Sequence, residues 1–401
     1  MIALTAAEIA AATGGVLRGA AATDPALVVS GPVVVDSRDD VTGGLFVALP
    51  GEHVDGHEYA AVAVAGGAAL VLAARDVVGP GGAVLPSVVV SDVEKALGDL
   101  ARVVLERLRD ASHEPGGSEL RVVGITGSVG KTTTKDLLAQ LCGSVGPTIA
   151  PVRSFNNEIG LPLTVLRADE STRFLVLEMG ASGPGHLTYL TDIAPPDVAV
   201  VLIVGHAHLG GFGGIDAVAV AKSEIVQGLV SDGVAVLNAD DPRVSAMASL
   251  APGDVITFGA APQATVGARD VRLDRAGRAR FTLVDRGDDR TAEVELRLVG
   301  EHHVHNALGA AAAALAVGLD LDQVAAGLSA ADALSPHRMH VVDRPDGVTV
   351  VDDSYNANPD SMRASAPSSS ISPSTAIERR SRPASTANAL SAARMESGFA
   401  L

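Results

Sequence analysis

One segment constrains the fold of this chain more than any other. Residues 126–132, Thr-Gly-Ser-Val-Gly-Lys-Thr, follow the hydrophobic run Val122–Thr126 and open a helical pattern at Thr132–Cys142. A glycine-rich turn between a buried strand and a helix lets backbone N–H groups approach phosphate oxygens, and the helix N-terminus adds the positive end of its dipole. The segment therefore predicts an α/β nucleotide-binding fold.

The residue types in this loop predict a role for each position. Gly127, Ser128 and Gly130 would surround the phosphates, Lys131 would reach the β- and γ-phosphates, and the hydroxyl of Thr132 would ligate Mg²⁺. The spacing departs from the strict phosphate-loop pattern, because an isoleucine stands where its first glycine belongs. A glycine-rich strand-to-helix turn without a nucleotide is the alternative, and Gly-Lys-Thr in this context disfavours it.

Buried-strand runs continue to alternate with helical patterns beyond the loop. Such alternation implies a parallel sheet, and ligands bind at the carboxyl ends of its strands. We expect strands at 174–177, 198–204 and 234–237, a helix at 215–229, an antiparallel insert at about 270–298 and a helix at 306–317.

The N-terminal part has shorter patterns of the same kind. We expect helices at 6–12, 59–65 and 93–109, and strands at 33–35, 45–49 and 88–90. This organisation predicts an N-terminal α/β domain at 1–114, a linker by composition at 113–118, and a central ATP-binding domain with a parallel sheet at 119–340.

The C-terminal part changes in composition. A strand at Val348–Val351 would open a third, Rossmann-like domain at 341–363, most of which we expect to be missing. Residues 364–401 are rich in Ser, Ala, Arg and Pro, a composition that cannot bury a core. We interpret them as an aberrant, disordered tail, out of frame or otherwise foreign; a genuine disordered tail is the alternative.

Composition limits the partners and the compartment. The net charge is −17 and no basic block is present, so nucleic acid is not an expected partner. The sequence contains no uncharged apolar run long enough to span a membrane, so we do not expect membrane insertion. The N-terminus carries no secretory signal. A single cysteine, Cys142, fits a reducing compartment. We expect a cytoplasmic monomer.

Four polar residues lie where ligands bind in such a sheet or on a helix beside it. Glu178 ends a strand run and could hold Mg²⁺ by oxygen ligation. His206 and His208 follow the next run, and Lys222 is one of four lysines in the chain. Taken singly, each is better explained as a solvated polar residue. The histidine-rich segment Glu301–Asn306 lacks the ligand spacing of a zinc site.

Taken together, these segments resemble the Mur ligase family, ATP-dependent amide-bond ligases of bacterial cell-wall precursor synthesis, over about residues 30–363. The segment Asn156–Pro162, Asn-Asn-Glu-Ile-Gly-Leu-Pro, is typical of the members that add D-alanyl-D-alanine. The other segments similar to the family are 126–132, 178–180, 207–209, 221–225, 300–308 and 353–359, with 36–38 and 55–57 resembling its uridine-nucleotide elements.

The resemblance implies site residues. It implies ATP binding by Gly127, Ser128, Gly130, Lys131, Thr132, Thr133, Asn306, Arg338 and Asp353, and metal binding by Thr132, Glu178 and His208. It implies substrate binding by Ser37, Arg38, His57, Asn156 and Asn157, and catalytic roles for Lys131, His208 and a carbamylated Lys222.

The implied reaction proceeds through an acyl phosphate. The terminal carboxylate of UDP-N-acetylmuramoyl-tripeptide attacks the γ-phosphate of ATP, and the amine of D-alanyl-D-alanine then displaces phosphate. Lys131 and two magnesium ions would neutralise the charge on the transferring group. An anionic carbamate on Lys222 would help to fix one metal where a plain lysine would repel it.

Three departures from the family bear on activity. Gly210 and Ser182 replace an acidic residue and an arginine that are common in relatives. The third is the shortened third domain, which in the family closes over ATP. We expect weak binding of the UDP substrate and little or no turnover. The alternatives are another Mur-type ligase, a folylpolyglutamate synthase-like enzyme, or a non-catalytic nucleotide-binding remnant.

Overall fold

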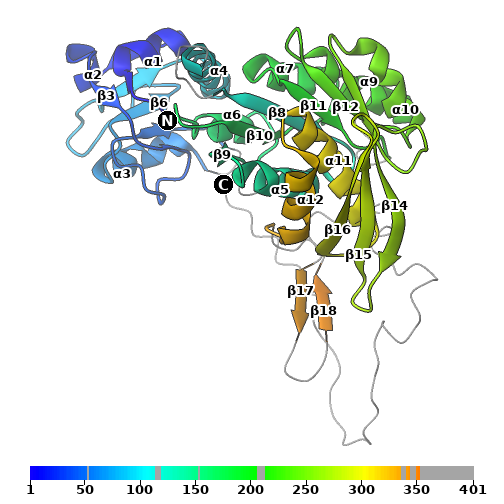
Figure 1. The fold of residues 1–401 in the computed structure, drawn as a ribbon. Coiled ribbons are helices and arrows are strands. Elements are labelled where there is room, and N and C mark those ends of the chain that lie inside the picture. Colours follow the sequence, from blue (N-terminus) through cyan, green and yellow to red (C-terminus); the bar gives the residue numbers. More distant parts are fainter. Residues whose placement is uncertain are drawn as a thin grey trace, which may run out of the picture.

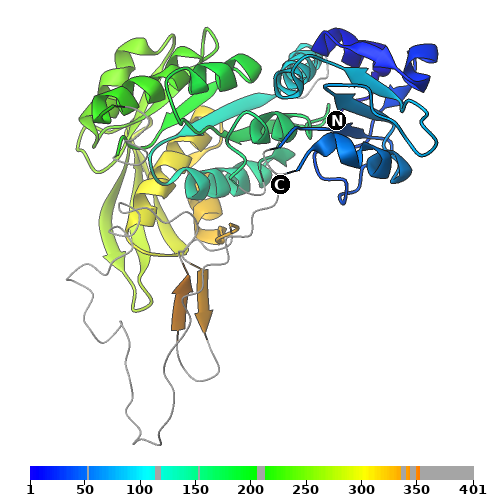
Figure 2. The same ribbon diagram turned by 180° about the vertical axis from the view of Figure 1, so that it is seen from behind.

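The computed structural model describes residues 1–51, 54–112, 119–151, 154–205, 213–335, 340–343 and 349–352. Within these residues an N-terminal region (1–112) and a central region (119–335) lie side by side, each with its own sheet (Figure 1). Figure 2 shows the same arrangement from behind. The predicted combination of two α/β regions is confirmed.

The N-terminal region is built on a five-stranded sheet with the order β2-β7-β6-β5-β4. Strands β4 to β7 run parallel, and β2 is antiparallel to β7. All four side chains of β6 are buried, as expected for a strand covered on both faces. Its elements are β1 (Leu4–Thr5), α1 (Ala6–Thr13), β2 (Val16–Arg18), α2 (Ala20–Thr23), β3 (Val28–Val29), β4 (Val33–Val34), β5 (Leu45–Val47), η1 (Gly56–Tyr59), α3 (Ala60–Ala65), β6 (Leu70–Ala73), β7 (Ser87–Val89) and α4 (Val93–Ser112).

The central region is built on a nine-stranded sheet with the order β16-β15-β14-β13-β12-β11-β8-β10-β9. The strands from β9 to β13 run parallel, which confirms the prediction. The elements that form its first part are β8 (Arg121–Thr126), α5 (Lys131–Gly143), β9 (Thr148–Ile149), α6 (Gly160–Val165), β10 (Phe174–Glu178), α7 (His186–Ile193), β11 (Val198–Val201), α9 (Ile215–Gln227) and β12 (Val234–Asn238).

The predicted antiparallel insert extends this sheet. Phe258 pairs with Val266, so β14 continues the sheet from β13, and β15 and β16 follow in antiparallel order. Figure 1 shows these three strands extending past the rest of the region. The remaining elements are α10 (Pro242–Ser245), η2 (Ala246–Leu250), β13 (Val255–Phe258), β14 (Val266–Leu273), β15 (Arg278–Asp285), β16 (Arg290–Val299), α11 (His302–Ala316) and α12 (Leu321–Ala330).

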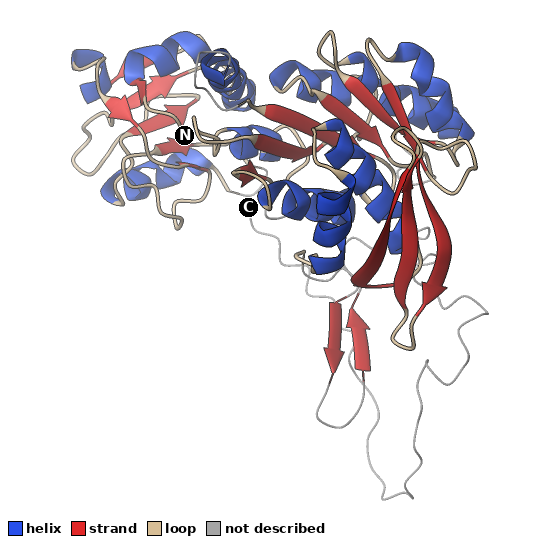
Figure 3. Cartoon of the chain, viewed as in Figure 1, coloured by secondary structure: helices blue, strands red, loops and turns tan. Residues whose placement is uncertain are grey.

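Helices cover both faces of the central sheet (Figure 3). Alternate side chains of β10 show why: Leu175 and Leu177 belong to one buried cluster, and Phe174 and Val176 belong to another. The first cluster contains residues of α4, α6, α7 and α9, and the second contains residues of α5, α11 and α12. This two-sided burial explains the continuous hydrophobic runs in the sequence.

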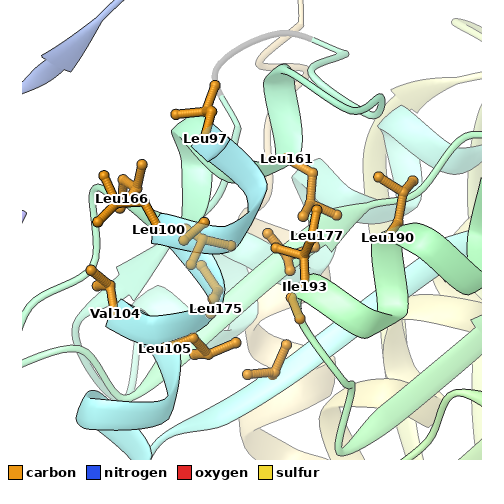
Figure 4. Close-up of a cluster of buried hydrophobic side chains, with 14 of the residues drawn as sticks. Leu97, Leu100, Val104, Leu105, Leu161, Leu166, Leu175, Leu177, Leu190 and Ile193 are labelled. Atoms are coloured by element: carbon orange, nitrogen blue, oxygen red, sulfur yellow. The ribbon is translucent and has the colours of Figure 1, made fainter. Parts of the chain in front are cut away.

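Helix α4 fixes the two regions against each other. Its residues Leu97, Leu100, Val104 and Leu105 pack on α6, β10 and α7 of the central region (Figure 4). At its C-terminal end Arg109 donates to Asp197 Oδ2 at 3.0 Å and to the carbonyl of Pro195 at 2.7 Å. One hydrophobic cluster therefore runs through both regions.

Two predicted elements differ in position. The helix predicted at 306–317 begins earlier, at His302, directly after Gly300 with φ of +120°. The strand predicted at Val348–Val351 is β18 (Thr349–Asp352), and it pairs antiparallel with β17 (His340–Asp343). In the described part of the chain, no helix has the length and apolar character needed to cross a membrane.

Candidate nucleotide and metal site

The phosphate loop connects the buried strand β8 to helix α5. Gly130, at φ of +86°, is the N-cap of α5, and no side chain caps this helix end. Such a helix start offers backbone N–H groups and a positive dipole end to a phosphate. Lys131 Nζ donates to the carbonyl of Gly127 at 2.8 Å, so the lysine side chain lies back along the loop.

Neighbouring segments support the loop from two sides. Gly205 N donates to Ser128 Oγ at 2.8 Å, and Ser128 N donates to the carbonyl of Ile203 at 2.8 Å. On the other side Asn306 of α11 lies so close to Gly130 that a side chain at Gly130 would collide with it. Both the left-handed backbone and the close approach therefore require glycine at this position.

Glu178 lies beside the helix end that follows the loop. Its strand, β10, pairs in parallel with β8, and Glu178 is opposite Ile125, so both strands end at the same edge. Glu178 Oε2 accepts a hydrogen bond from Thr132 Oγ1 at 2.9 Å, and the glutamate is only 1% exposed. A buried carboxylate next to a loop hydroxyl supplies the hard oxygen donors that Mg²⁺ prefers. Thr132 and Glu178 therefore fit a magnesium ion.

The segment before α6 supplies two more donors to Glu178. Ser154 Oγ donates to Glu178 Oε1 at 2.6 Å, and Asn156 Nδ2 donates to the same oxygen at 2.8 Å. The sequence analysis did not identify Ser154. The only signal was its position two residues before the Asn-Asn-Glu-Ile-Gly segment.

Lys222 lies on the inner side of α9 and is 5% exposed. Among the described residues its side chain has no hydrogen-bond or ion-pair partner. Burial, and then the positive charge of Lys131, lower the pKa of Lys222 to about 7. A larger share of its amine groups is therefore neutral at neutral pH than in an exposed lysine.

A small cavity lies on the far side of the start of α5. His303 Nε2 and Ser335 Oγ line it and have no hydrogen-bond partner among the residues that the structure describes, although both residues are more than nine-tenths buried. Burial, and then the neighbouring His302, lower the pKa of His303 to about 3. The full lining is Thr133, Asp136, Leu137, Leu298, His303, Asp332, Ala333 and Ser335.

Two residues predicted to bind substrate have contacts within the fold. His57 Nδ1 bonds to Asp55 Oδ1 at 2.5 Å, and His57 Nε2 accepts from Ala74 N at 2.8 Å. Asn157 Oδ1 accepts from Gly160 N at 2.9 Å at the start of α6. Both ring nitrogens of His57 form hydrogen bonds within the fold. In this structure His57 therefore holds the loop after β5 against the end of β6.

The Asp36–Arg38 segment is different, because it lies on the surface. The Arg38 side chain is 82% exposed and bonds to Asp36, and this contact lowers the pKa of Asp36 to about 2. Ser37 is half-buried. These residues belong to the N-terminal region and stand apart from the cluster at the phosphate loop.

Several predicted site residues lie outside the described residues. These are His206, His208, Gly210, Arg338 and Asp353. Ser182 is described, and its hydroxyl bonds to His186 Nδ1 at 2.7 Å. The structure thus brings together Lys131, Thr132, Glu178, Asn156 and Asn306.

A phosphate loop at the carboxyl edge of a parallel sheet, with a carboxylate beside its threonine, defines an α/β nucleotide-binding protein. Comparison with known proteins narrows this class. Residues 125–314 match the Mur ligase middle domain, and residues 33–105 match the Mur ligase family catalytic domain. The chain belongs to the Mur ligase family.

Individual relatives are similar over most of the chain. A UDP-N-acetylmuramoyl-tripeptide–D-alanyl-D-alanine ligase of Mycobacterium bovis is 48% identical over 374 residues, which are 91% of this chain and 73% of the relative. The crystal structure of MurF from Acinetobacter baumannii has a TM-score of 0.79 at 33% identity, covering 90% of this chain and 75% of that one. MurF of Thermotoga maritima in complex with ADP has a TM-score of 0.69 at 30% identity, covering 84% and 73%.

Proposed function

We propose that this chain is a cytoplasmic, monomeric ligase that joins D-alanyl-D-alanine to UDP-N-acetylmuramoyl-tripeptide at the expense of ATP. The observation that carries the proposal is the contact of Thr132 with Glu178 at the start of α5. It supports a phosphate site with a metal position beside it. The substrates follow from the shared name of relatives such as the M. bovis ligase.

The described residues support the phosphoryl-transfer step. The loop N–H groups and Lys131 would hold the β- and γ-phosphates while the tripeptide carboxylate attacks the γ-phosphorus. A magnesium ion held by Thr132 and Glu178 would supply charge neutralisation on those phosphates. Such a step depends mainly on positioning and electrostatics. The predicted second magnesium ion and the role of His208 concern residues outside the described part.

The segment 300–308 is proposed to contact the adenine base, as its similarity to the family's adenine-contacting segment implies. Asn306 of this segment lies next to Gly130 of the phosphate loop, and Asn306 Nδ2 approaches His303 Nδ1 at 3.4 Å. Base and phosphates would thus bind near the same asparagine. The small cavity beside α5 has room for a water molecule and not for a purine.

Lys222 is proposed to carry a carbamate. A neutral amine attacks CO₂, forming an N–C bond and releasing one proton, and the product is anionic. The lowered pKa of Lys222, about 7, supports this step because the neutral amine is the reactive form. In ¹³C-bicarbonate, we expect a carbamate NMR signal from the wild-type chain that Lys222→Met lacks. The same signal in both proteins would exclude Lys222 as the site.

Product formation tests the ligation itself. The purified chain is incubated with ATP, Mg²⁺, UDP-N-acetylmuramoyl-tripeptide and D-alanyl-D-alanine, and the product is read by mass spectrometry so that slow turnover is detected. We expect a product whose mass equals both substrates minus water, and none from the isosteric variant Glu178→Gln.

Replacing the substrates distinguishes the alternative activities. Product with a free amino acid and a shorter UDP precursor, but not with D-alanyl-D-alanine, would indicate another Mur-type ligase. Product with a folate and glutamate would indicate a folylpolyglutamate synthase-like enzyme. Binding of both ATP and the UDP precursor with no product in any mixture would contradict the proposed ligation by this chain. It would agree with the expected lack of turnover and favour a non-catalytic nucleotide-binding protein.

A further inference from the structure

We propose that Ser154 is a positioning residue that makes Glu178 a one-oxygen ligand and thereby favours Mg²⁺ over larger cations. This inference rests on the proposed function, because it assumes a metal–nucleotide complex at Thr132 and Glu178. It concerns a residue outside the phosphate loop and outside the metal ligands, whose effect would be exerted through the carboxylate.

The two oxygens of Glu178 have different partners. Oε1 accepts from Ser154 Oγ at 2.6 Å and from Asn156 Nδ2 at 2.8 Å. Oε2 accepts from Thr132 Oγ1 at 2.9 Å. Oε2 therefore bonds to the threonine of the phosphate loop, and Oε1 bonds to two donors from the segment before α6.

Ser154 is the centre of this polar group. Its hydroxyl accepts from Asn156 Nδ2 at 3.2 Å and lies 3.4 Å from Thr132 Oγ1. A hydroxyl has one proton, and in the 2.6 Å contact Ser154 Oγ directs that proton toward Glu178 Oε1. Asn156 thus orients Ser154, and Ser154 in turn fixes the plane of the carboxylate.

The backbone holds this arrangement in place. Gly180 N donates to the carbonyl of Asn156 at 2.8 Å, directly beyond the end of β10. A side chain at Gly180 would press on Asn156 at 3.1 Å. The segment that carries Ser154 is therefore tied to the strand that carries Glu178.

The consequence of this arrangement is a preference of the site for Mg²⁺ over Ca²⁺. Mg²⁺ requires near-octahedral geometry with short metal–oxygen distances and accepts one oxygen per carboxylate, whereas Ca²⁺ accepts both oxygens in a looser shell. With Oε1 bonded to Ser154 and Asn156, Glu178 offers only Oε2. Removal of the Ser154 hydroxyl frees part of Oε1 and allows two-oxygen binding.

The test compares ADP affinity in three solutions, with Mg²⁺, with Ca²⁺ and with EDTA, by calorimetry. Ser154→Ala should weaken ADP binding in Mg²⁺ about tenfold, the loss typical of removing a group that orients a metal ligand. Its affinity in EDTA should stay within about twofold of wild type, and its preference for Mg²⁺ over Ca²⁺ should narrow. Ser154→Thr, which keeps the hydroxyl, should behave like wild type.

Ser171→Ala is the matched control, because the exposed Ser171 hydroxyl bonds within its own turn, to Asp169 Oδ1 at 2.6 Å. An equal loss of ADP affinity for Ser154→Ala in all three solutions would show a merely structural role and overturn the proposal. So would an unchanged Mg²⁺ preference, or equal defects in Ser154→Ala and Ser154→Thr. A wild-type chain that binds no ADP in any solution would instead overturn the proposed function.

Discussion

The polar residues at the phosphate loop and the Asp36–Arg38 segment of the N-terminal region are held in opposite ways. Around Glu178, donors from α5 and from the segment before α6 converge on one side chain that is 1% exposed. In the N-terminal region Arg38 is 82% exposed, and its bonds to Asp36 span two residues of one turn. The first site is assembled by the tertiary fold before a ligand arrives, whereas the second leaves its cation free to reorient.

Pre-assembly has a measurable meaning. Polar groups held by several buried hydrogen bonds lose little entropy when a ligand binds, but substitution of one of them disturbs the others. An exposed arginine can be substituted with little effect on the fold. The comparison therefore predicts large, coupled effects in the central region and small, local effects at Arg38.

The largest effect is expected for the phosphate-loop lysine. Lys131→Met should weaken ADP binding about 10²–10³-fold, because it removes the only loop cation that can reach the phosphates. Calorimetry measures the loss. Lys95→Met is the matched control, since the exposed Lys95 pairs with Asp99 on the surface of α4. Equal effects of the two substitutions would contradict the assignment of the loop.

A buried lysine should also make stability depend on pH. The pKa of Lys222 is lowered in the folded chain to about 7, so between pH 7 and its ordinary value the unfolded state binds more protons. Stability from this group therefore rises with pH through that window and is lowest below pH 7. In CO₂-depleted buffer Lys222→Met should be more stable than wild type by roughly 5 kcal/mol near pH 6.

The difference between wild type and Lys222→Met should shrink as the pH rises toward 10, as followed by urea unfolding. A constant difference over this range would show that Lys222 keeps an ordinary pKa in the folded chain. Taking differences removes the contribution of other groups that titrate in the same window.

His57 adds a buried residue of the N-terminal region to the comparison. If its role is to hold the loop after β5 through both ring nitrogens, His57→Ala should cost about 2 kcal/mol of unfolding free energy. Urea unfolding measures this cost. Unchanged stability combined with loss of UDP-precursor binding would show instead that His57 contacts the substrate directly.

The smallest effect on stability is expected at Arg38. Arg38→Ala should leave the thermal midpoint unchanged, because the side chain is exposed, while weakening binding of the UDP precursor about tenfold. Arg18→Ala is a suitable control, since Arg18 forms a similar surface pair with Asp76 in the same region. A lowered midpoint for Arg38→Ala would contradict the contrast between the two regions.

Much of this architecture could be predicted from the sequence, for identifiable reasons. The runs that became β8, β10, β11 and β12 are hydrophobic throughout because both faces of the sheet are covered. Glu178 and Thr132 could be paired because strands that are parallel neighbours end at one edge. These are local patterns with a direct structural meaning.

Other features depend on contacts between distant segments. Ser154 acquires its position only when the segment before α6 folds back on the end of β10, across 24 residues. The substrate-binding role of His57 stays a prediction from the family resemblance, and its partners in the fold, the side chain of Asp55 and the N–H of Ala74, cannot be recognised from sequence. The early start of α11 follows Gly300, whose left-handed backbone turns the chain before His302.

The central claim is that the phosphate loop, Thr132 and Glu178 form one magnesium–nucleotide site. The most direct test is calorimetric titration of ADP into the wild-type chain and into Glu178→Gln, with Mg²⁺ and with EDTA. The account predicts that Mg²⁺ tightens ADP binding at least tenfold in the wild type and that this gain is lost in Glu178→Gln. Equal affinity with and without Mg²⁺ in the wild type, or an undiminished Mg²⁺ gain in Glu178→Gln, would contradict it.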